Sequence, residues 1–199
     1  MTIHVLEPER RTLHGHFSRD LPPAVTIDPG DSVILRTLDA GWGLEPHPRD
    51  GSPRRQFEPR RPDLDTGHAL CGPIAIRGAE PGMTLAVHID EIQAGTYGAT
   101  YVGAWEHPIN ERFGLLKNAL RLDWELDPER LIGRNQFGHS LALRPFLGVM
   151  GLPPAEPGQH STVPPRATGG NLDCKELVAG STLYLPIAVP GALFSAGDG

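Results

Sequence analysis

The chain has 199 residues, of which 39% are hydrophobic and 21% charged, and its net charge is −6 at pH 7. This length is typical of one large domain or two small ones, and we expect a single domain over residues 1–199. No apolar run approaches the roughly 20 residues that cross a bilayer, which excludes a membrane-spanning helix. The acidic balance offers no attraction to nucleic-acid phosphates. Because the N-terminus lacks the apolar stretch of a secretory signal, we expect a cytoplasmic protein without membrane or nucleic-acid partners.

The glycine, proline and cysteine content narrows the fold class. The chain contains 24 glycines and 21 prolines, about twice the usual share. Such frequent turns favour an all-β, jelly-roll-like β-sandwich with long irregular loops and almost no helix. The two cysteines, Cys71 and Cys174, do not form a C-x-x-C pair, which argues against a zinc ribbon or a disulfide scaffold.

Alternation of apolar and polar residues predicts about ten short strands. The alternation is clearest at Leu122, Trp124 and Leu126, which are separated by charged residues. In chain order, the main predicted strands cover residues 12–17, 24–28, 33–38, 74–76, 84–92, 120–126, 139–143, 182–189 and 192–195. The only helical structure predicted is a single turn at 128–132, where Pro128 can occupy the first helical position.

A short pattern, G-x-[ST]-[VL]-x-[LV], occurs three times. Its copies begin at Gly30, Gly82 and Gly180, and the first two glycines follow a proline. Proline suits the second position of a type II turn and glycine the third. Each copy therefore predicts a turn that leads into a strand.

Two long stretches lack any periodicity, and loops of this length in a compact domain are usually functional or disordered. The first, residues 39–72, is rich in arginine and proline and contains His47 and His68, which could reach a site if the loop folds over it. The second, residues 150–172, leads into a dense group of polar residues. There Gly169 and Gly170 precede an Asn-x-Asp sequence, and glycines let backbone amides approach a ligand closely. An ordinary solvated loop remains the alternative.

The C-terminal quarter of the chain carries a family resemblance. The stretch PFLGVMGLPPAEPGQHSTVPPRATGGNLDCKELVAGSTLYLPIAVPGALFSAGDG, residues 145–199, resembles the acetamidase/formamidase family. Segments at 29–31, 37–40, 72–74 and 78–82 are similar to earlier parts of that family, in the expected order. The resemblance implies a β-sandwich enzyme that hydrolyses short amides, such as formamide and acetamide, to a carboxylate and ammonia.

The resemblance also shows a departure at the C-terminus. In family members a Gly-Asp-Gly sequence is followed by histidine and a second Gly-Asp-Gly-Glu, whereas this chain ends at Gly199. We therefore expect that the chain lacks the family's C-terminal portion. Missing strands leave sheet edges unpaired, which favours association, so we expect a homo-oligomer. The alternative is a catalytically silent β-sandwich fragment that binds a small ligand or a partner subunit.

Two mechanisms are compatible with the polar residues of the chain. In the first, Asp39, His160, Asp173 and Asp198 hold a divalent metal ion, expected to be zinc, which lowers the pKa of bound water. Asp39 and Asp198 have an alternative role as turn residues.

In the second mechanism Cys174 is the nucleophile and Lys175 stabilises its thiolate. The run Cys174-Lys175-Glu176 is unfavourable for this chemistry, because neighbouring side chains of an extended segment point to opposite faces. We assign Asp173 and Lys175 as candidate catalytic residues.

Asn171 and Gly170 are the candidate substrate-binding residues. Together with the candidate metal ligands they define a site for a small amide.

Overall fold

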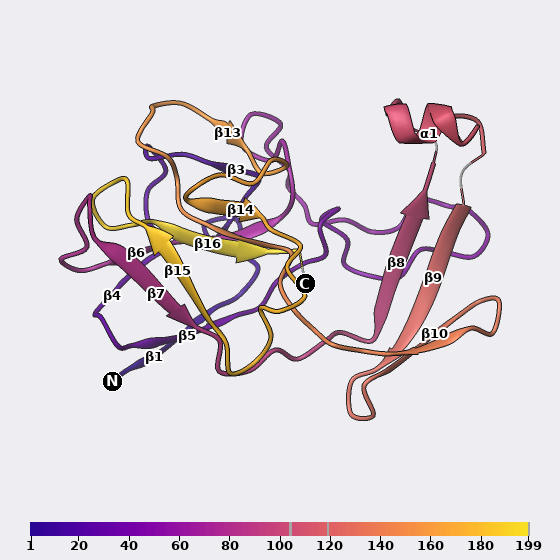
Figure 1. Cartoon of the computed structure of the whole chain (residues 1–199), viewed down its shortest axis with the longest axis horizontal. Helices are drawn as coiled ribbons and strands as arrows, with labels where there is room; N and C mark the ends of the chain where they lie inside the picture. The colour runs from indigo at the N-terminus through magenta and orange to yellow at the C-terminus, as the bar shows by residue number, and fades with distance from the viewer. Residues whose placement is uncertain (104, 119, 199) are drawn as a thin grey trace. The chain divides into compact units, whose positions relative to one another are not determined.

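The computed structural model describes residues 1–103, 105–118 and 120–198, which pack as two compact units (Figure 1). Unit 1 comprises Met1–Leu44, Arg55–Ile92 and Pro145–Gly199, and unit 2 comprises Glu45–Arg54 and Gln93–Arg144. The single domain expected from the sequence stays a prediction. No helix among the described residues is long and apolar enough to cross a membrane.

The largest sheet of unit 1 has six strands. Five of them lie in the order β14-β12-β16-β6-β2, and β4 pairs with β6 in addition. Their bounds are β2 Leu13–His14, β4 Val25–Ile27, β6 Leu70–Ile76, β12 Val149–Gly151, β14 Gly169–Asn171 and β16 Phe194–Gly197. Since β14 and β16 are each antiparallel to β12, they run in the same direction. Their C-terminal ends therefore lie at the same edge of the sheet.

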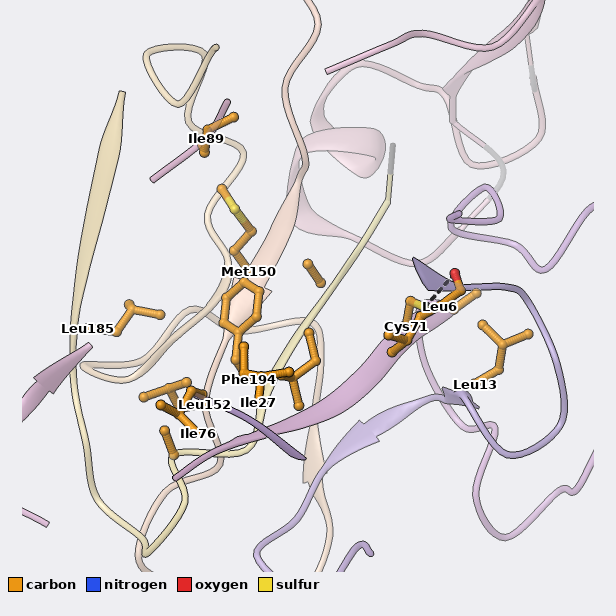
Figure 2. Packing of buried hydrophobic residues seen from close by; sticks show 14 of the residues in the cluster. Leu6, Leu13, Ile27, Cys71, Ile76, Ile89, Met150, Leu152, Leu185 and Phe194 are labelled. Atoms are coloured by element: carbon orange, nitrogen blue, oxygen red, sulfur yellow. Dashed lines mark hydrogen bonds between the residues drawn. The ribbon is translucent and has the colours of Figure 1, made fainter. Parts of the chain in front are cut away.

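Three two-stranded sheets complete unit 1. They pair β1 Ile3–Leu6 with β5 Ser32–Leu35, β13 His160–Ser161 with β3 His16–Phe17, and β15 Thr182–Pro186 with β7 Thr84–His88. Leu185 of β15 belongs to the same buried cluster as Met150 and Phe194 of the six-stranded sheet (Figure 2). Leu6 of β1 joins this cluster as well. One hydrophobic core thus connects the sheets of unit 1.

Unit 2 contains a four-stranded antiparallel sheet in the order β11-β10-β9-β8 and one short helix. Their bounds are β8 Tyr97–Val102, α1 Pro108–Arg112, β9 Leu120–Asp127, β10 Ile132–Asn135 and β11 Ser140–Ala142. Among the residues that the structure describes, neither buried hydrophobic cluster includes a side chain of this unit. Several of its large apolar side chains, Phe113 and Phe137 among them, are exposed.

These elements confirm the all-β class with almost no helix. The alternating stretch at 120–126 is strand β9. The helical turn predicted at 128–132 is wrong, because Arg130 N donates to the Asp127 side chain and Leu131 has a φ of 53°, which closes a hairpin between β9 and β10. In the part of the chain that the structure describes, the one helix is α1, which begins at a proline elsewhere in unit 2.

The repeated glycine pattern does mark turns that lead into strands. Gly30, Gly82 and Gly180 have φ values of 89°, 92° and 86° and precede β5, β7 and β15. At the first copy, Asp31 N donates to Asp28 O at 3.1 Å, as in a type II turn. The predicted strand at 192–195 begins later than expected, because Ala192 and Leu193 both have a φ of 60°.

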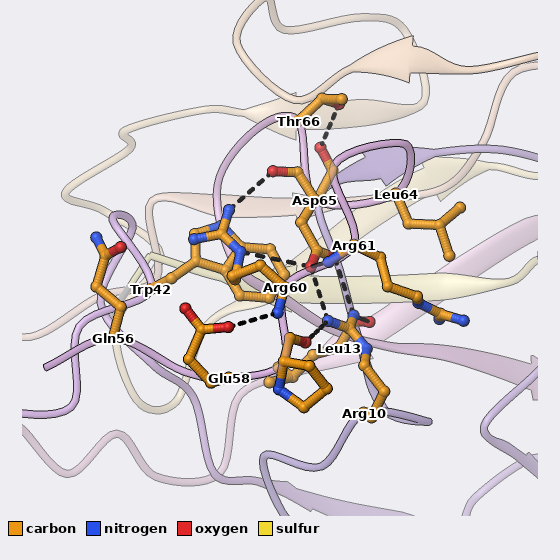
Figure 3. Close-up of polar contacts among 12 residues, drawn as sticks. Arg10, Leu13, Trp42, Gln56, Glu58, Arg60, Arg61, Leu64, Asp65 and Thr66 are labelled. Carbon is orange, nitrogen blue, oxygen red and sulfur yellow. Dashed lines mark hydrogen bonds and ion pairs between the residues drawn. The ribbon is translucent and has the colours of Figure 1, made fainter.

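A buried ion pair anchors part of the arginine-rich loop (Figure 3). The Asp65 side chain has no exposed surface and accepts two hydrogen bonds from the Arg10 guanidinium, at 2.7 and 2.9 Å. Arg60 stacks over the Trp42 ring at 4.1 Å. This part of the loop is therefore held against the core of unit 1, since a charge buried at Asp65 must keep its partners.

His14 is a buried histidine whose environment keeps it neutral. Burial is the main cause that lowers its pKa from 6.5 to about 4. Below pH 6.5 the unfolded chain binds a proton at this ring, whereas the folded chain does so only near pH 4. Stability from His14 is therefore complete above pH 6.5 and is lost as the pH falls towards 4.

We expect the free energy of unfolding to decrease by roughly 3 kcal/mol over this interval because of His14. Urea denaturation at several pH values measures the decrease. His14→Gln should flatten the profile, whereas replacement of the exposed His88 by Gln should leave it unchanged. An equally steep profile in His14→Gln protein contradicts the assignment.

Candidate functional site

Three of the carboxylates predicted from the sequence meet His68 at one edge of the six-stranded sheet. Asp173 follows β14 and Asp198 follows β16, and these two strands end at the same edge. His68 lies just before β6, which runs antiparallel to β16 and so begins at that edge. Asp39 is brought to the same place because Ala69 N donates to Ala40 O at 3.3 Å.

Three of these groups, His68, Asp173 and Asp39, act electrostatically on the fourth, Asp198. The pKa of Asp198 is raised above its ordinary value, mainly by burial. The charge of His68 opposes this increase, and the negative charges of Asp173 and Asp39 add to it. Asp198, Asp39 and His68 are partly buried and Asp173 is exposed, and the negative charge of Asp198 is poorly compensated where it lies.

Gly148 provides the surface on which two of the carboxylates lie. A Cβ atom added at Gly148 would lie 2.6 Å from Asp198 Oδ2 and 3.0 Å from Asp173 Oδ1. The two carboxylates thus lie side by side over a position that has no side chain. Gly148 N donates to Asp198 O at 2.8 Å, and Asp173 N donates to Gly148 O at 3.1 Å.

The backbone of both carboxylate-bearing residues is strained. Asp173 and Asp198 have φ values of 45° and 58°, in the left-handed region that non-glycine residues rarely adopt. Such strain costs about 1–3 kcal/mol for each residue and is concentrated at functional sites. The strain is consistent with a role for these two carboxylates beyond packing.

His68 is held in place by a buried hydroxyl group. Thr162 Oγ1 lies 2.8 Å from His68 Nδ1 and accepts a hydrogen bond from His68 N at 3.0 Å. Thr162 is fully buried. The sequence indicated only that His68 could reach a site if the arginine-rich loop folds over it, and no local signal pointed to Thr162. His47, the other histidine of that loop, belongs to unit 2, where it contacts Tyr101.

The remaining predicted residues lie in different environments. His160 Nε2 is 2.9 Å from the Glu156 carbonyl oxygen, and His160 is not among the groups that shift the pKa of Asp198. The Lys175 side chain is exposed. Asp39 Oδ1 accepts a hydrogen bond from Gly43 N at 3.0 Å, so Asp39 also has the turn role considered as its alternative.

The candidate substrate-binding residue Asn171 contains an unusual acceptor. Its Oδ1 atom is buried and has no hydrogen-bond partner among the described residues. An unpaired buried acceptor costs about 1–3 kcal/mol unless a ligand or water satisfies it. Its neighbour Gly170 has a φ of 123°, which favours glycine.

Cys174 and Cys71 differ from activated thiols. Cys174 Sγ lies 3.5 Å from the Glu176 carboxylate, and its side chain packs against the hydrophobic core. Burial raises the pKa of Cys71 to about 12.

The donors at this edge are of the kind that a divalent ion accepts, namely carboxylates and an imidazole. In the described part of the chain, however, no three His, Cys, Asp or Glu side chains are grouped closely enough to hold an ion. The side-by-side carboxylates of Asp173 and Asp198 fit two positions of such a site, and further ligands would need to move into place.

Comparison with known proteins connects this geometry to a family. A model of the Acetamidase/Formamidase family matches residues 3–161 and 155–199. The chain belongs to this family. It is 28% identical to a formamidase homologue of Schizosaccharomyces pombe over 96% of the chain, and 26% identical to the acetamidase of Mycolicibacterium smegmatis over 93% of the chain. It spans 58% of the length of each of these relatives.

Solved structures of two acetamidases and of a gamma lactamase have the same fold. The acetamidase of Yersinia enterocolitica superposes with a TM-score of 0.74 at 27% identity, covering 98% of this chain and 59% of its own. The acetamidase of Bacillus halodurans gives a TM-score of 0.75 at 24% identity, covering 98% of this chain and 61% of its own. A gamma lactamase of Delftia acidovorans gives 0.77 at 23% identity, with coverage of 100% and 61%.

Proposed function

We propose that this protein hydrolyses short aliphatic amides, such as formamide and acetamide, to a carboxylate and ammonia. Family membership and the names of its relatives, which include an acetamidase and a formamidase, support amide hydrolysis. The observation that carries the proposal is the position of Asp173 and Asp198 side by side over Gly148, with His68 and Asp39 acting on the same carboxyl group.

We propose further that a divalent ion, with zinc as the first candidate, binds at Asp173 and Asp198. Asp39 and His68 are the other donors nearby, and His160 remains a predicted ligand at a greater distance along the loop. When bound, such an ion lowers the pKa of water and polarises a carbonyl group. The raised pKa of Asp198 indicates that its ionised form lacks compensation, and a cation supplies that compensation.

The NH2 group of an amide substrate is a hydrogen-bond donor, and the chain offers an acceptor for it. We propose that Asn171 Oδ1 accepts a hydrogen bond from the substrate NH2 group, since this buried oxygen has no partner among the described residues. The open backbone of Gly170 lets the substrate approach closely. Asp173 is the proposed catalytic carboxylate, and the predicted catalytic role of the exposed Lys175 stays a prediction.

The proposal is tested by ammonia release from formamide and acetamide with purified, zinc-loaded protein. We expect release to stop when a chelator removes the ion and to resume when zinc is added back. Absence of ammonia release from zinc-loaded protein overturns the proposed activity for this chain. Ammonia release that a chelator does not affect overturns the proposed role of the metal ion.

Replacement of Cys174 separates the two mechanisms. Because Cys174 packs on the core and faces a carboxylate, we expect Cys174→Ala protein to keep its rate of ammonia release within about twofold. A rate loss of a hundredfold or more, in protein that remains folded by circular dichroism, would show that the thiol is the nucleophile.

A second candidate function is a catalytically silent module that binds a small ligand or a partner subunit. The chain spans 58% of the length of its curated relatives, and its activity on its own has to be measured. Calorimetric titration with acetamide distinguishes the candidates, since a silent module binds the amide without releasing ammonia.

We also propose that the protein forms a homo-oligomer. The exposed apolar side chains of unit 2, including Trp105, Ile109 and Phe113, are typical of a surface that another chain covers. A second copy of this chain is the proposed occupant, and light scattering during size exclusion measures the oligomeric state. The expected cytoplasmic location and the absence of nucleic-acid partners remain predictions.

A further inference from the structure

A buried hydrogen bond connects two strands that are not neighbours in the sheet. His14 lies on β2 and Ser195 on β16, and these strands lie on opposite sides of β6. His14 Nε2 is nevertheless 3.0 Å from Ser195 Oγ. Both side chains are buried, at 3% and 1% exposure. The hydrogen bond therefore crosses the central strand between them.

Gly72 of β6 makes this crossing possible. A Cβ atom added at Gly72 would lie 2.6 Å from Ser195 Oγ and 2.9 Å from Phe194 O, closer than Cβ atoms approach other heavy atoms. The pairing of β16 with β6 is also irregular here, with a register shift between Phe194 and Ala196. The missing side chain and the irregular pairing together leave room for the Ser195 hydroxyl group to reach over the strand.

The second ring nitrogen of His14 determines which group donates in the hydrogen bond between His14 and Ser195. His14 Nδ1 lies 2.7 Å from the His16 carbonyl oxygen, which can only accept. Nδ1 therefore carries the proton, and in the neutral ring Nε2 is an acceptor. Ser195 donates its hydroxyl proton to Nε2, so every polar atom of the pair has a defined role.

The strands that carry His14 and Ser195 both pair with β6, close to the candidate site. On β6, Leu70 is paired with His14 on one side and with Gly197 on the other. Gly197 packs tightly against β6 and has no room for a side chain, because an added Cβ would lie 2.1 Å from Ala69 O. Asp198 follows Gly197 directly, and His68 lies two residues before Leu70. The position of β16 along β6 thus determines where Asp198 lies relative to His68.

We infer that Ser195 and His14 are positioning residues, whose hydrogen bond across Gly72 sets the place of the Asp198 carboxylate at the site. This inference rests on the proposed function for its effect on catalysis, although the geometry that it describes belongs to the fold. Neither residue is proposed to contact the substrate. A displacement of about 1 Å at reacting groups can lower a rate about a hundredfold, so a small shift of β16 has a measurable effect.

Two pairs of variants test the inference in the full 199-residue chain. Ser195→Ala removes the donor, and Ser181→Ala removes a comparable hydroxyl whose hydrogen bond to Val178 O lies elsewhere in unit 1. His14→Leu removes the acceptor, whereas His14→Gln retains one acceptor for Ser195 and one donor for His16 O. Ser195→Ala and His14→Leu are expected to disturb the site, and the other two variants are the controls.

Hydrogen exchange gives a readout that does not depend on activity. Gly148 N donates to Asp198 O, so protection of this amide reports where Asp198 lies. Ile187 N donates to Met83 O in another part of unit 1 and reports global stability. We expect at least a tenfold loss of protection at Gly148 relative to Ile187 in Ser195→Ala and His14→Leu protein, and no relative loss in the controls.

Kinetics with formamide give the second readout. We expect kcat to fall by about tenfold or more in Ser195→Ala protein with KM little changed, and His14→Gln to recover most of the rate that His14→Leu loses. Unchanged Gly148 protection, or a parallel loss at Ile187, overturns the positioning role. If the parent chain releases no ammonia while Gly148 loses protection as expected, the proposed function fails and the positioning of Asp198 stands.

Discussion

Replacement of Asp198 by asparagine is expected to lower the rate of ammonia release by about a thousandfold, in the range found when one charged or polar group is removed from an active site. Asn keeps the size of the side chain and removes its charge. The carboxylate of Asp198 lies beside that of Asp173 and within the field of His68 and Asp39. The substitution therefore removes one of the two carboxylates that we propose as ligands of the ion.

The same substitution should leave the fold intact. Burial raises the pKa of Asp198, so its ionised form is less favourable in the folded chain than in the unfolded chain, and its charge lowers stability above the ordinary carboxyl pKa. We therefore expect the melting temperature of Asp198→Asn protein at pH 7 to be unchanged or slightly higher. Asp90→Asn, at an exposed position of unit 1, is the matched control. Normal turnover by Asp198→Asn protein would exclude this carboxylate from the reaction.

Substitution of Gly148 by alanine is expected to lower the rate about a hundredfold through geometry alone. The new methyl group would lie 2.6 Å from Asp198 Oδ2 and 3.0 Å from Asp173 Oδ1, so both carboxylates must turn away. The atoms that it meets are the ends of side chains, which can move. The backbone of Gly148 is outside the left-handed region, so alanine itself introduces no strain there.

The effect on stability should therefore be small, about 1 kcal/mol or less. Gly95→Ala provides the control, because an added Cβ at this exposed glycine meets no atom within 4 Å and the backbone accepts alanine. Steady-state kinetics and thermal melting measure both effects. If Gly148→Ala protein keeps full activity, the two carboxylates do not act together. If it unfolds, the two carboxylates cannot move aside as the geometry indicates.

The sequence predicted those elements whose side chains alternate or whose turns need glycine. The alternation around Trp124 identified β9, and the positive φ values at Gly30 and Gly82 match the expected turns. The short strands β12 and β14 were missed, since Val149–Gly151 and Gly169–Asn171 are three residues long and rich in glycine. Their pairing depends on backbone contacts with distant strands, which leave no periodic signal.

The candidate site could be predicted only in part, because some of its contacts join residues that are far apart in the sequence. Asp39, Asp173 and Asp198 were selected from their sequence context, and the structure brings all three within one electrostatic environment, while their role as ligands remains a prediction. The contribution of His68 depends on the anchoring of the arginine-rich loop and on its hydrogen bond with Thr162, which is 94 residues away along the chain. Such a contact follows from the topology of the sheet and has no counterpart in local sequence.

A crystal structure of the protein soaked with zinc, with anomalous diffraction data, tests the central claim most directly. We predict an anomalous peak above Gly148, bonded to carboxylate oxygens of both Asp173 and Asp198, at about 2.0–2.2 Å from each. A peak at some other place in the molecule, or no peak with the two carboxylates turned apart, would contradict the proposed hydrolytic centre.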